Sequence, residues 1–333
     1  MGALDGRVAV ITGAGRGIGR AEALFFAEHG AKVVVNDPGV AADGSAGDTG
    51  VAQRVADEIT ALGGRAVATS DSVAEWDGAR RVVATAVEAF GDLDVLVNNA
   101  AIERNRAVSV MTEEDFDAVV AVKLKGTFAT TRWAVRHWRS RAEAGELRDR
   151  SVVNTASGSG LLNPLPAQTN YAAVNAGIAA MTTVHALELG RYRVRVNCVS
   201  PSMVRTRLSE AVPGMPGPAP AGAYDPAHPV AVAPVAAYLA SAACTLNGQV
   251  VSVRGGSVAI NRGWTTGPRV DAGARYWTVP ELAAELESLP HGDPVAELTA
   301  ALRGALGAGG EAAIRHMIDT ALDAPDPAPP VGA

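Results

Sequence analysis

The sequence predicts an α/β fold, in which helices cover both faces of a doubly wound parallel sheet of seven strands. Short Val-rich runs alternate with Ala-rich helical stretches over the first 253 residues of the 333-residue chain. Each run is apolar throughout, whereas a strand with one face in water would alternate apolar and polar residues. Alternating strands and helices are typical of a parallel sheet, because a crossover helix connects each strand to the next.

The seven predicted strands are short and rich in β-branched residues, as expected of strands that are buried on both faces. They comprise residues 7–11, 32–36, 65–69, 94–97, 151–154, 193–199 and 249–253. The helices expected between them are longer and richer in alanine, which favours helical backbone. They comprise residues 17–29, 49–62, 75–90, 113–141, 168–189 and 234–241. One dinucleotide-binding domain over residues 1–265 would account for all of these elements.

Three segments do not follow this alternation. Residues 39–49 are rich in Gly, Ala and Asp and predict a surface loop after the second strand. Residues 213–229 are rich in proline and glycine, which predicts an irregular lid on the substrate side of the sheet. A C-terminal helical extension is expected over residues 266–322, with helices at 280–288, 294–306 and 311–322. The proline-rich residues 323–333 are expected to be disordered.

Composition and charge exclude several classes of protein. The net charge is −6 without a long basic run, which argues against nucleic acid or a membrane surface as a partner. No stretch approaches the ~20 apolar residues of a membrane span, and the N-terminus lacks the order of a secretory signal. Cys198 and Cys244 are expected to be buried thiols, and the histidines lack metal-ligand spacing. We therefore expect a cytoplasmic protein without a metal site.

A glycine-rich turn follows the first predicted strand. Gly13, Gly17 and Gly19 lie between that strand and the first predicted helix, in the spacing Gly-x-x-x-Gly-x-Gly. Glycine at these positions allows a tight turn, close approach of the backbone to a pyrophosphate and close helix–sheet packing. A plain strand–helix connection is the alternative. The acid that ends the second strand favours a dinucleotide site.

That acid is Asp37, eighteen residues beyond Gly19. Its carboxylate can accept hydrogen bonds from both hydroxyls of an adenosine ribose and would repel a 2′-phosphate, so NAD is favoured over NADP as the cofactor. Arg16 weakens this preference, because a nearby guanidinium could attract the phosphate. The alternative for Asp37 is that it only begins a turn before Pro38.

Several motifs occur in the order found in the short-chain dehydrogenase/reductase family, which the chain resembles over residues 5–263. They are the Gly-rich turn, Asn98-Asn99-Ala100-Ala101, Ser157, Tyr171 and the segment from Asn197 to Pro201. The resemblance implies a Rossmann-type fold, a small-molecule substrate and a homodimer or homotetramer. Segments 35–37, 71–73, 124–128, 156–160, 253–256 and the tail from Trp277 most resemble the (3R)-hydroxyacyl-CoA dehydrogenase region of peroxisomal multifunctional enzyme type 2 and its bacterial relatives.

By this resemblance, three groups of residues would hold the cofactor. The pyrophosphate would lie against the three glycines of the turn, next to Arg16. The nicotinamide end would contact Ile18, and its carboxamide would be held by Pro201, Val204 and Thr206. The adenosine end would contact Asp71 and Ser72 at the adenine and Asn99 and Ala100 at the ribose.

The same resemblance places the chemistry at Ser157 and Tyr171. The tyrosine hydroxyl would exchange a proton with the substrate oxygen during hydride transfer, and Ser157 would stabilise that oxygen, with Ser159 as the competing assignment. The family has a lysine four residues after the tyrosine, where this chain has Asn175. Asparagine can keep a hydrogen bond to the nicotinamide ribose but brings no charge. Because a free tyrosine titrates near ~10, this loss should lower ordinary turnover by orders of magnitude.

Lys123 is a candidate to compensate for that loss. It lies where the family commonly has an asparagine, in the helix before the fifth strand, so that lysine and asparagine look exchanged. We hypothesise that Lys123 points inward and restores a charge beside Tyr171, since its four-carbon side chain can be redirected. The alternative is a solvent-facing lysine on an ordinary helix, beside Lys125.

Three functions are compatible with the sequence. The one that we predict is an NAD-dependent oxidoreductase acting on a hydroxyl/ketone pair, such as a hydroxyacyl thioester or a specialised metabolite. The second is a repurposed enzyme in which Ser157 and Tyr171 catalyse dehydration, isomerisation or cyclisation. The third is a catalytically silent partner subunit that binds NAD or a homologue.

Overall fold

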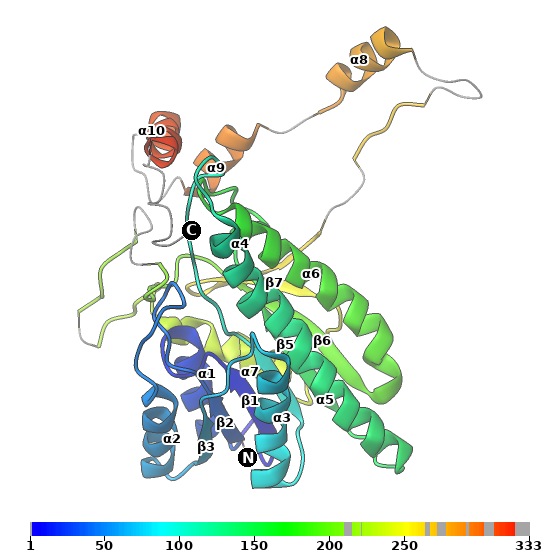
Figure 1. Cartoon of the computed structure of the whole chain (residues 1–333). Helices are drawn as coiled ribbons and strands as arrows, with labels where there is room; N and C mark the ends of the chain where they lie inside the picture. Colours follow the sequence, from blue (N-terminus) through cyan, green and yellow to red (C-terminus); the bar gives the residue numbers. More distant parts are fainter. Residues whose placement is uncertain are drawn as a thin grey trace.

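The centre of the fold is one eight-stranded sheet, seen in a computed structural model (Figure 1). The structure describes residues 2–209, 215–220, 222–263, 267–271, 278–290, 293–302 and 310–323. The strand order is β3-β2-β1-β4-β5-β6-β7-β8. The strands are β1 (Val8–Thr12), β2 (Lys32–Asn36), β3 (Arg65–Thr69), β4 (Val95–Asn98), β5 (Arg150–Thr155), β6 (Val194–Pro201), β7 (Val250–Arg254) and β8 (Ser257–Asn261). Neighbours from β3 to β7 are all parallel, which confirms the predicted doubly wound α/β fold.

The eighth strand is a difference from the predicted seven-stranded sheet. β8 runs antiparallel to β7 after a tight turn at Gly255 and Gly256, with Val251 opposite Ile260. Gly255 has a φ of +55°, a left-handed conformation that favours glycine. β8 lies at the sheet edge and its side chains are mostly exposed, although its sequence Ser-Val-Ala-Ile-Asn contains three consecutive apolar residues. The Gly-Gly pair before it is a hairpin signal that the sequence analysis did not use.

Helices cover both faces of the sheet. They are α1 (Gly17–Glu28), α2 (Val51–Ala61), α3 (Trp76–Phe90), α4 (Glu113–Val119), α5 (Gly126–Glu143), α6 (Thr169–Leu189) and α7 (Ala233–Ala240). α1, α2 and α7 form one core with strand residues such as Ile11 and Val35. α3, α5 and α6 form the other with residues such as Val10 and Val34. Because successive strand side chains point to opposite faces, strands that feed two cores are apolar at their central positions.

A π-helical segment interrupts the helix predicted over residues 113–141. This segment, η1 (Val120–Lys125), separates α4 from α5. α4 begins at a capping box in which Thr112 and Asp115 exchange hydrogen bonds, which anchors the start of the whole helical run. A π-helical turn accommodates an extra residue and is frequent at functional sites. Here it contains Lys123, which is only 2% exposed.

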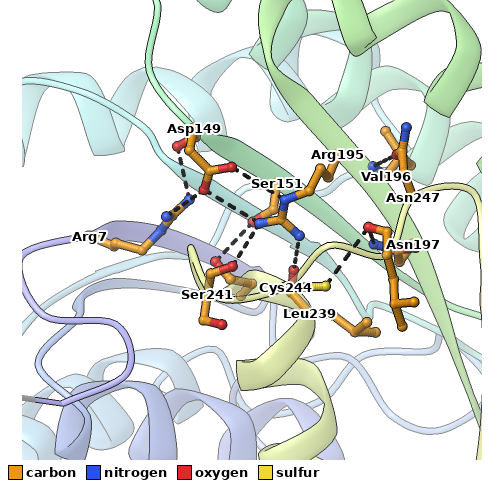
Figure 2. A network of polar contacts seen from close by, with 12 residues as sticks. Arg7, Asp149, Ser151, Arg195, Val196, Asn197, Leu239, Ser241, Cys244 and Asn247 are labelled. Carbon is orange, nitrogen blue, oxygen red and sulfur yellow. Dashed lines mark hydrogen bonds and ion pairs between the residues drawn. The ribbon is translucent and has the colours of Figure 1, made fainter.

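Ion pairs stabilise the sheet at the amino ends of its strands (Figure 2). Asp149, just before β5, pairs with Arg7 before β1 at 2.9 Å and with Arg195 in β6 at 3.3 Å. Arg195 also donates to the backbone carbonyls of Leu239 and Ser241 at the end of α7, at 2.9 and 2.8 Å. This network connects three strands and a helix at the edge opposite the carboxyl ends, so it leaves the carboxyl ends open for a ligand.

Within the described residues, β8 is followed by the helices α8 (Val279–Ser288), α9 (Pro294–Leu302) and α10 (Gly310–Leu322). They confirm the predicted helices at 280–288 and 311–322, while part of the helix predicted at 294–306 lies outside the described residues. So do residues 324–333, on which the predicted disorder falls. In Figure 1, α8 stands away from the sheet, whereas α9 and α10 lie near the start of α6.

The remaining connections agree with the sequence analysis where the structure describes them. Residues 39–49 form a loop, and 215–220 and 222–228 contain neither helix nor strand. Short 3₁₀ turns are η2 (Gly190–Tyr192) and η3 (Pro229–Ala231). Cys198 and Cys244 are buried free thiols, as predicted. None of the helices in the described ranges has the length and apolarity to cross a membrane.

Candidate active site

The candidate active site lies at the carboxyl ends of the parallel strands, where the strand order reverses between β1 and β4. In open α/β sheets, ligands bind in the crevice at this reversal. A cavity of about 460 Å³ opens there. The predicted site residues that line it are Gly13, Arg16, Gly17, Ile18, Asp37, Ser72, Asn99, Ala100, Lys123, Ser157, Tyr171, Pro201, Val204 and Thr206. The lining does not include Gly19, Asp71 or Asn175.

The Gly-rich turn is held against the end of β4. The Asn99 amide donates to the carbonyl oxygens of Thr12 and Gly13 at 3.0 and 3.2 Å. A Cβ atom at Gly13 would lie 2.8 Å from the Ala100 Cα, and one at Gly19 would lie 2.4 Å from the Asn99 amide nitrogen. Only glycine therefore allows this close approach. Gly19 and the Asn99 side chain contact the turn and hold its conformation.

The N-terminus of α1 opens onto the cavity. Arg16 occupies the N-cap position without a side-chain cap, and the first turn of the helix contains no acidic residue. The first backbone N–H groups of a helix have no partner within it, and the helix dipole favours negative charge at this end. These N–H groups and the adjoining turn fit the pyrophosphate of a dinucleotide.

Asp37 stands at the end of β2 and lines the cavity. It is buried, and its two carboxylate oxygens accept hydrogen bonds from the backbone N–H groups of Gly15 at 2.9 Å and Gly39 at 2.7 Å. These bonds aim the carboxylate at the turn and leave lone pairs for hydroxyl donors. The Arg16 guanidinium lies 3.9 Å from the Asp48 carboxylate and donates to the Val40 carbonyl oxygen at 3.4 Å, so the loop after β2 holds it.

Asp71 and Ser72 end the segment after β3. The Asp71 carboxylate accepts from the Thr69 hydroxyl at 2.9 Å and pairs with Arg81 at 2.5 Å. Ser72 lines the cavity, but Asp71 does not. The Asp71 side chain therefore braces this segment, and Ser72 is the residue that faces the space available to a ligand.

Tyr171 in α6 and Ser157 after β5 face the same cavity. Tyr171 is 7% exposed. Burial and the nearby Glu103 carboxylate raise the pKa of its hydroxyl, while contacts with the Ser157 and Asn175 side chains act in the opposite direction. The Ser157 hydroxyl accepts from the backbone N–H of Ser159 at 3.2 Å. Because Ser157 contacts the tyrosine, it fits the assigned role better than Ser159.

Asn175 lies one helical turn after Tyr171 and is fully buried. Its amide nitrogen donates to the Tyr171 carbonyl oxygen at 2.8 Å, and its amide oxygen has no partner among the described residues. Asn175 does not line the cavity in this arrangement. It therefore supports α6 behind Tyr171, where the family pattern has a charged side chain.

The Lys123 side chain points inward. Its ammonium donates to the Thr155 carbonyl oxygen at 3.0 Å and lies 5.4 Å from the centre of the Tyr171 ring. Burial lowers the pKa of Lys123 from 10.5 to about 8, while the Cys198 and Glu103 side chains act to raise it. By contrast, Lys125 two residues on is exposed. The π-helical turn thus places the Lys123 amine in the interior beside Tyr171, whereas Lys125 remains in solvent.

Glu103 is a site residue that the sequence analysis missed. It follows β4, lines the cavity and accepts from the Asn105 amide at 3.0 Å and the Gln168 amide at 3.4 Å. Burial raises the pKa of its carboxyl, while Asn105 and the Lys123 charge act to lower it. The only sequence signal was an acid five residues after the end of β4, which any exposed loop could also contain. Among the described residues, no cluster of His, Cys, Asp and Glu could hold a metal.

The comparisons with known proteins agree with this geometry. The family model of the short chain dehydrogenases matches residues 7–215, which contain the turn, Ser157 and Tyr171. The chain belongs to the short-chain dehydrogenase family. The family model ends before α7, so the last two strands and the C-terminal helices lie beyond the matched range.

Relatives of this short-chain dehydrogenase extend the match. The hydroxyacyl-CoA dehydrogenase ChsB1 of Mycobacterium tuberculosis is 42% identical over 85% of this chain and 88% of its own length. The peroxisomal multifunctional enzyme type 2 of Drosophila melanogaster is 38% identical over 76% of this chain but only 39% of its own length. The crystal structure of a short chain dehydrogenase from Mycobacterium avium has 47% identity and a TM-score of 0.77, covering 88% of this chain and 99% of that one. The predicted resemblance to hydroxyacyl-CoA dehydrogenases is confirmed.

Proposed function

We propose that this chain is an NAD-dependent oxidoreductase that interconverts a hydroxyl and a ketone group of a hydroxyacyl thioester. The observation that carries the proposal is the convergence of Ser157, Tyr171 and Lys123 on the cavity that borders the Gly-rich turn. The substrate class follows the relatives, since ChsB1 is named a hydroxyacyl-CoA dehydrogenase and a Thermotoga maritima relative is named a 3-oxoacyl-[acyl-carrier-protein] reductase.

The preference for NAD rests on charge. The Asp37 carboxylate lines the cavity at the end of β2, where it would repel a ribose 2′-phosphate. The Arg16 guanidinium, which could attract that phosphate, is already near Asp48 and bonded to the Val40 carbonyl oxygen. The local charge therefore favours a free 2′-hydroxyl, and hence NAD over NADP.

In the proposed reaction, NAD held by the Gly-rich turn, Ile18 and Asp37 would supply the chemistry of hydride transfer. Ser157 donates a hydrogen bond to the substrate oxygen and holds it beside Tyr171. The Tyr171 phenolate takes up the proton of the substrate hydroxyl in the oxidation, and the Tyr171 hydroxyl gives a proton to the ketone oxygen in the reduction. Burial and the Glu103 carboxylate oppose the ionised form of Tyr171, so the proton transfer needs a nearby positive charge.

We assign that charge to Lys123. A unit charge 5.4 Å from the ring centre stabilises a phenolate by roughly 3 kcal/mol at an effective dielectric constant of about 20. This offsets part of the cost of ionising Tyr171, which is larger than the roughly 3–4 kcal/mol needed to shift a free tyrosine by 2–3 pKa units, because burial and Glu103 raise the pKa of this tyrosine. The pKa of Lys123 is about 8, so the amine is mostly charged at pH 7. Lys123 would then supply the charge of the family's lysine, whereas the Asn175 amide, which bonds the Tyr171 carbonyl oxygen and does not line the cavity, would not replace its hydrogen bond to the nicotinamide ribose.

A second candidate is non-redox chemistry such as dehydration or isomerisation. The raised pKa of Tyr171 favours it, because a tyrosine that keeps its proton is suited to act as a general acid. Under this alternative the dinucleotide would be a structural ligand or absent.

The test is absorbance at the reduced-nicotinamide band after NAD and a 3-hydroxyacyl-CoA are mixed with the protein. The proposal expects the band to grow with wild type and to be lost with Tyr171→Phe, while NAD binding by calorimetry is unchanged. Product formation without any change in the band would instead support the non-redox candidate. A Tyr171→Phe variant that is as active as wild type would exclude both.

A further inference from the structure

The C-terminal helices α9 and α10 have a small apolar core of their own. Leu298 and Leu302 of α9 are 2% and 4% exposed, and Ile314 of α10 is fully buried. Leu165, in the loop between β5 and α6, packs against this cluster. That loop also contains Ser157 and ends just before Tyr171. The extension is therefore docked on the segment that holds the proposed catalytic residues.

One residue of the extension reaches the active-site cavity. Leu302, at the end of α9, lines the cavity together with Leu165 and with Leu208 from the segment after β6. α8 differs from α9, because none of its residues is buried and none of them lines the cavity. Among the described parts of the extension, α9 alone combines a buried face with a contribution to the site.

We propose that α9 forms the acyl-binding wall of the site, with Leu302, Leu165 and Leu208 contacting the apolar chain of the substrate. Three leucines from separate segments provide only apolar contacts, so they can recognise a hydrocarbon chain but neither a phosphate nor a sugar. Leu165 lies in the same loop as Ser157, and Leu208 follows the segment assigned to the nicotinamide carboxamide. Both therefore lie towards the reacting end of the cavity, whereas the adenosine contacts would come from the ends of β2, β3 and β4. The substrate class would then be hydroxyacyl thioesters with long acyl chains. This inference rests on the proposed function.

The test compares 3-hydroxybutyryl-CoA with 3-hydroxydodecanoyl-CoA as substrates of the full-length chain with NAD. Leu302→Ala removes contacts only from the long chain, so kcat/KM should fall about tenfold for the dodecanoyl substrate and by less than about twofold for the butyryl substrate. The matched control is Leu286→Ala in α8, a half-exposed leucine outside the cavity, which should change neither value. If Leu302→Ala does not fold, Leu302→Phe keeps the core apolar and adds bulk, which should again impair only the longer substrate.

Equal losses for both substrates, or no loss for either, would overturn the assignment of the wall. Calorimetric binding of the two thioesters separates this inference from the proposed function. In one outcome, wild type binds the dodecanoyl thioester more tightly than the butyryl thioester, Leu302→Ala abolishes this difference, and the reduced-nicotinamide band does not grow. That outcome would support the acyl-binding wall and reject the oxidoreductase. Turnover of both thioesters with equal affinity would retain the oxidoreductase and reject the wall.

Discussion

Replacing Glu22 by glutamine should stabilise the folded chain at pH 8 and leave its stability near pH 5 almost unchanged. Glu22 lies in α1, is fully buried, and neither of its carboxylate oxygens has a hydrogen-bond partner among the described residues. Burial without a partner disfavours the charged form, which raises the pKa of this carboxyl from 4.5 to about 8. The folded chain therefore holds a proton here that the unfolded chain has released at neutral pH.

The magnitude follows from that difference in proton binding. A raised pKa contributes stability that is complete below the unfolded value and is lost as the pH rises through the folded value. Between pH 4.5 and 8, the free energy of unfolding should fall by about 1.4 kcal/mol per pH unit through this group. The loss is about 3 kcal/mol at pH 7 and about 5 kcal/mol above pH 8. Glutamine has nearly the same shape and does not titrate, so the variant should escape this loss.

The assay is urea unfolding followed by far-UV circular dichroism, at several pH values and without NAD, because a bound ligand would add its own stabilisation. The difference between Glu22→Gln and wild type should grow with pH. The control is Glu28→Gln, an exposed glutamate in the same helix, for which no such trend is expected. A difference for Glu22→Gln that is the same at every pH would refute the reasoning.

Three further predictions concern the site. Lys123→Ala should lower kcat about a hundredfold, since roughly 3 kcal/mol of charge stabilisation is lost. The control is Lys125→Ala, at an exposed lysine, which should have almost no effect on kcat. Equal effects of the two variants in steady-state assays would reject the proposed exchange of lysine and asparagine. Asp37→Ala should weaken NAD binding in calorimetry about tenfold and reduce the discrimination against NADP, and unchanged ratios would contradict its assignment. Asn175→Lys should lower the melting temperature and kcat, because it adds a second buried cation to the site that already holds Lys123. Adding Lys123→Asn should return both values towards those of wild type, and a single variant more active than wild type would count against this.

Much of the fold follows from local sequence signals. The strands that feed both cores, such as Lys32–Asn36, have an apolar centre. This pattern can be recognised without knowing which strands pair with them. The Gly-rich turn, Asp37, Ser157 and Tyr171 were also identified from the sequence, because a turn after a strand and motifs in fixed order need no tertiary information. β8 was not predicted, although three apolar residues follow the Gly-Gly pair there, because so short a run does not distinguish an exposed edge strand from a loop.

The sequence by itself determined the parallel sheet, the family and many of the residues that line the cavity, because periodicity, turns and motifs are local properties of the chain. Only the tertiary structure decided where Lys123 points. An extra residue in the π-helical turn rotates the side chains that follow by about 100°, and the sequence gives no sign of that turn. Only the structure, likewise, brought Glu103 beside Tyr171 and Leu302 to the cavity, since each is distant from Tyr171 along the chain and meets the site through packing.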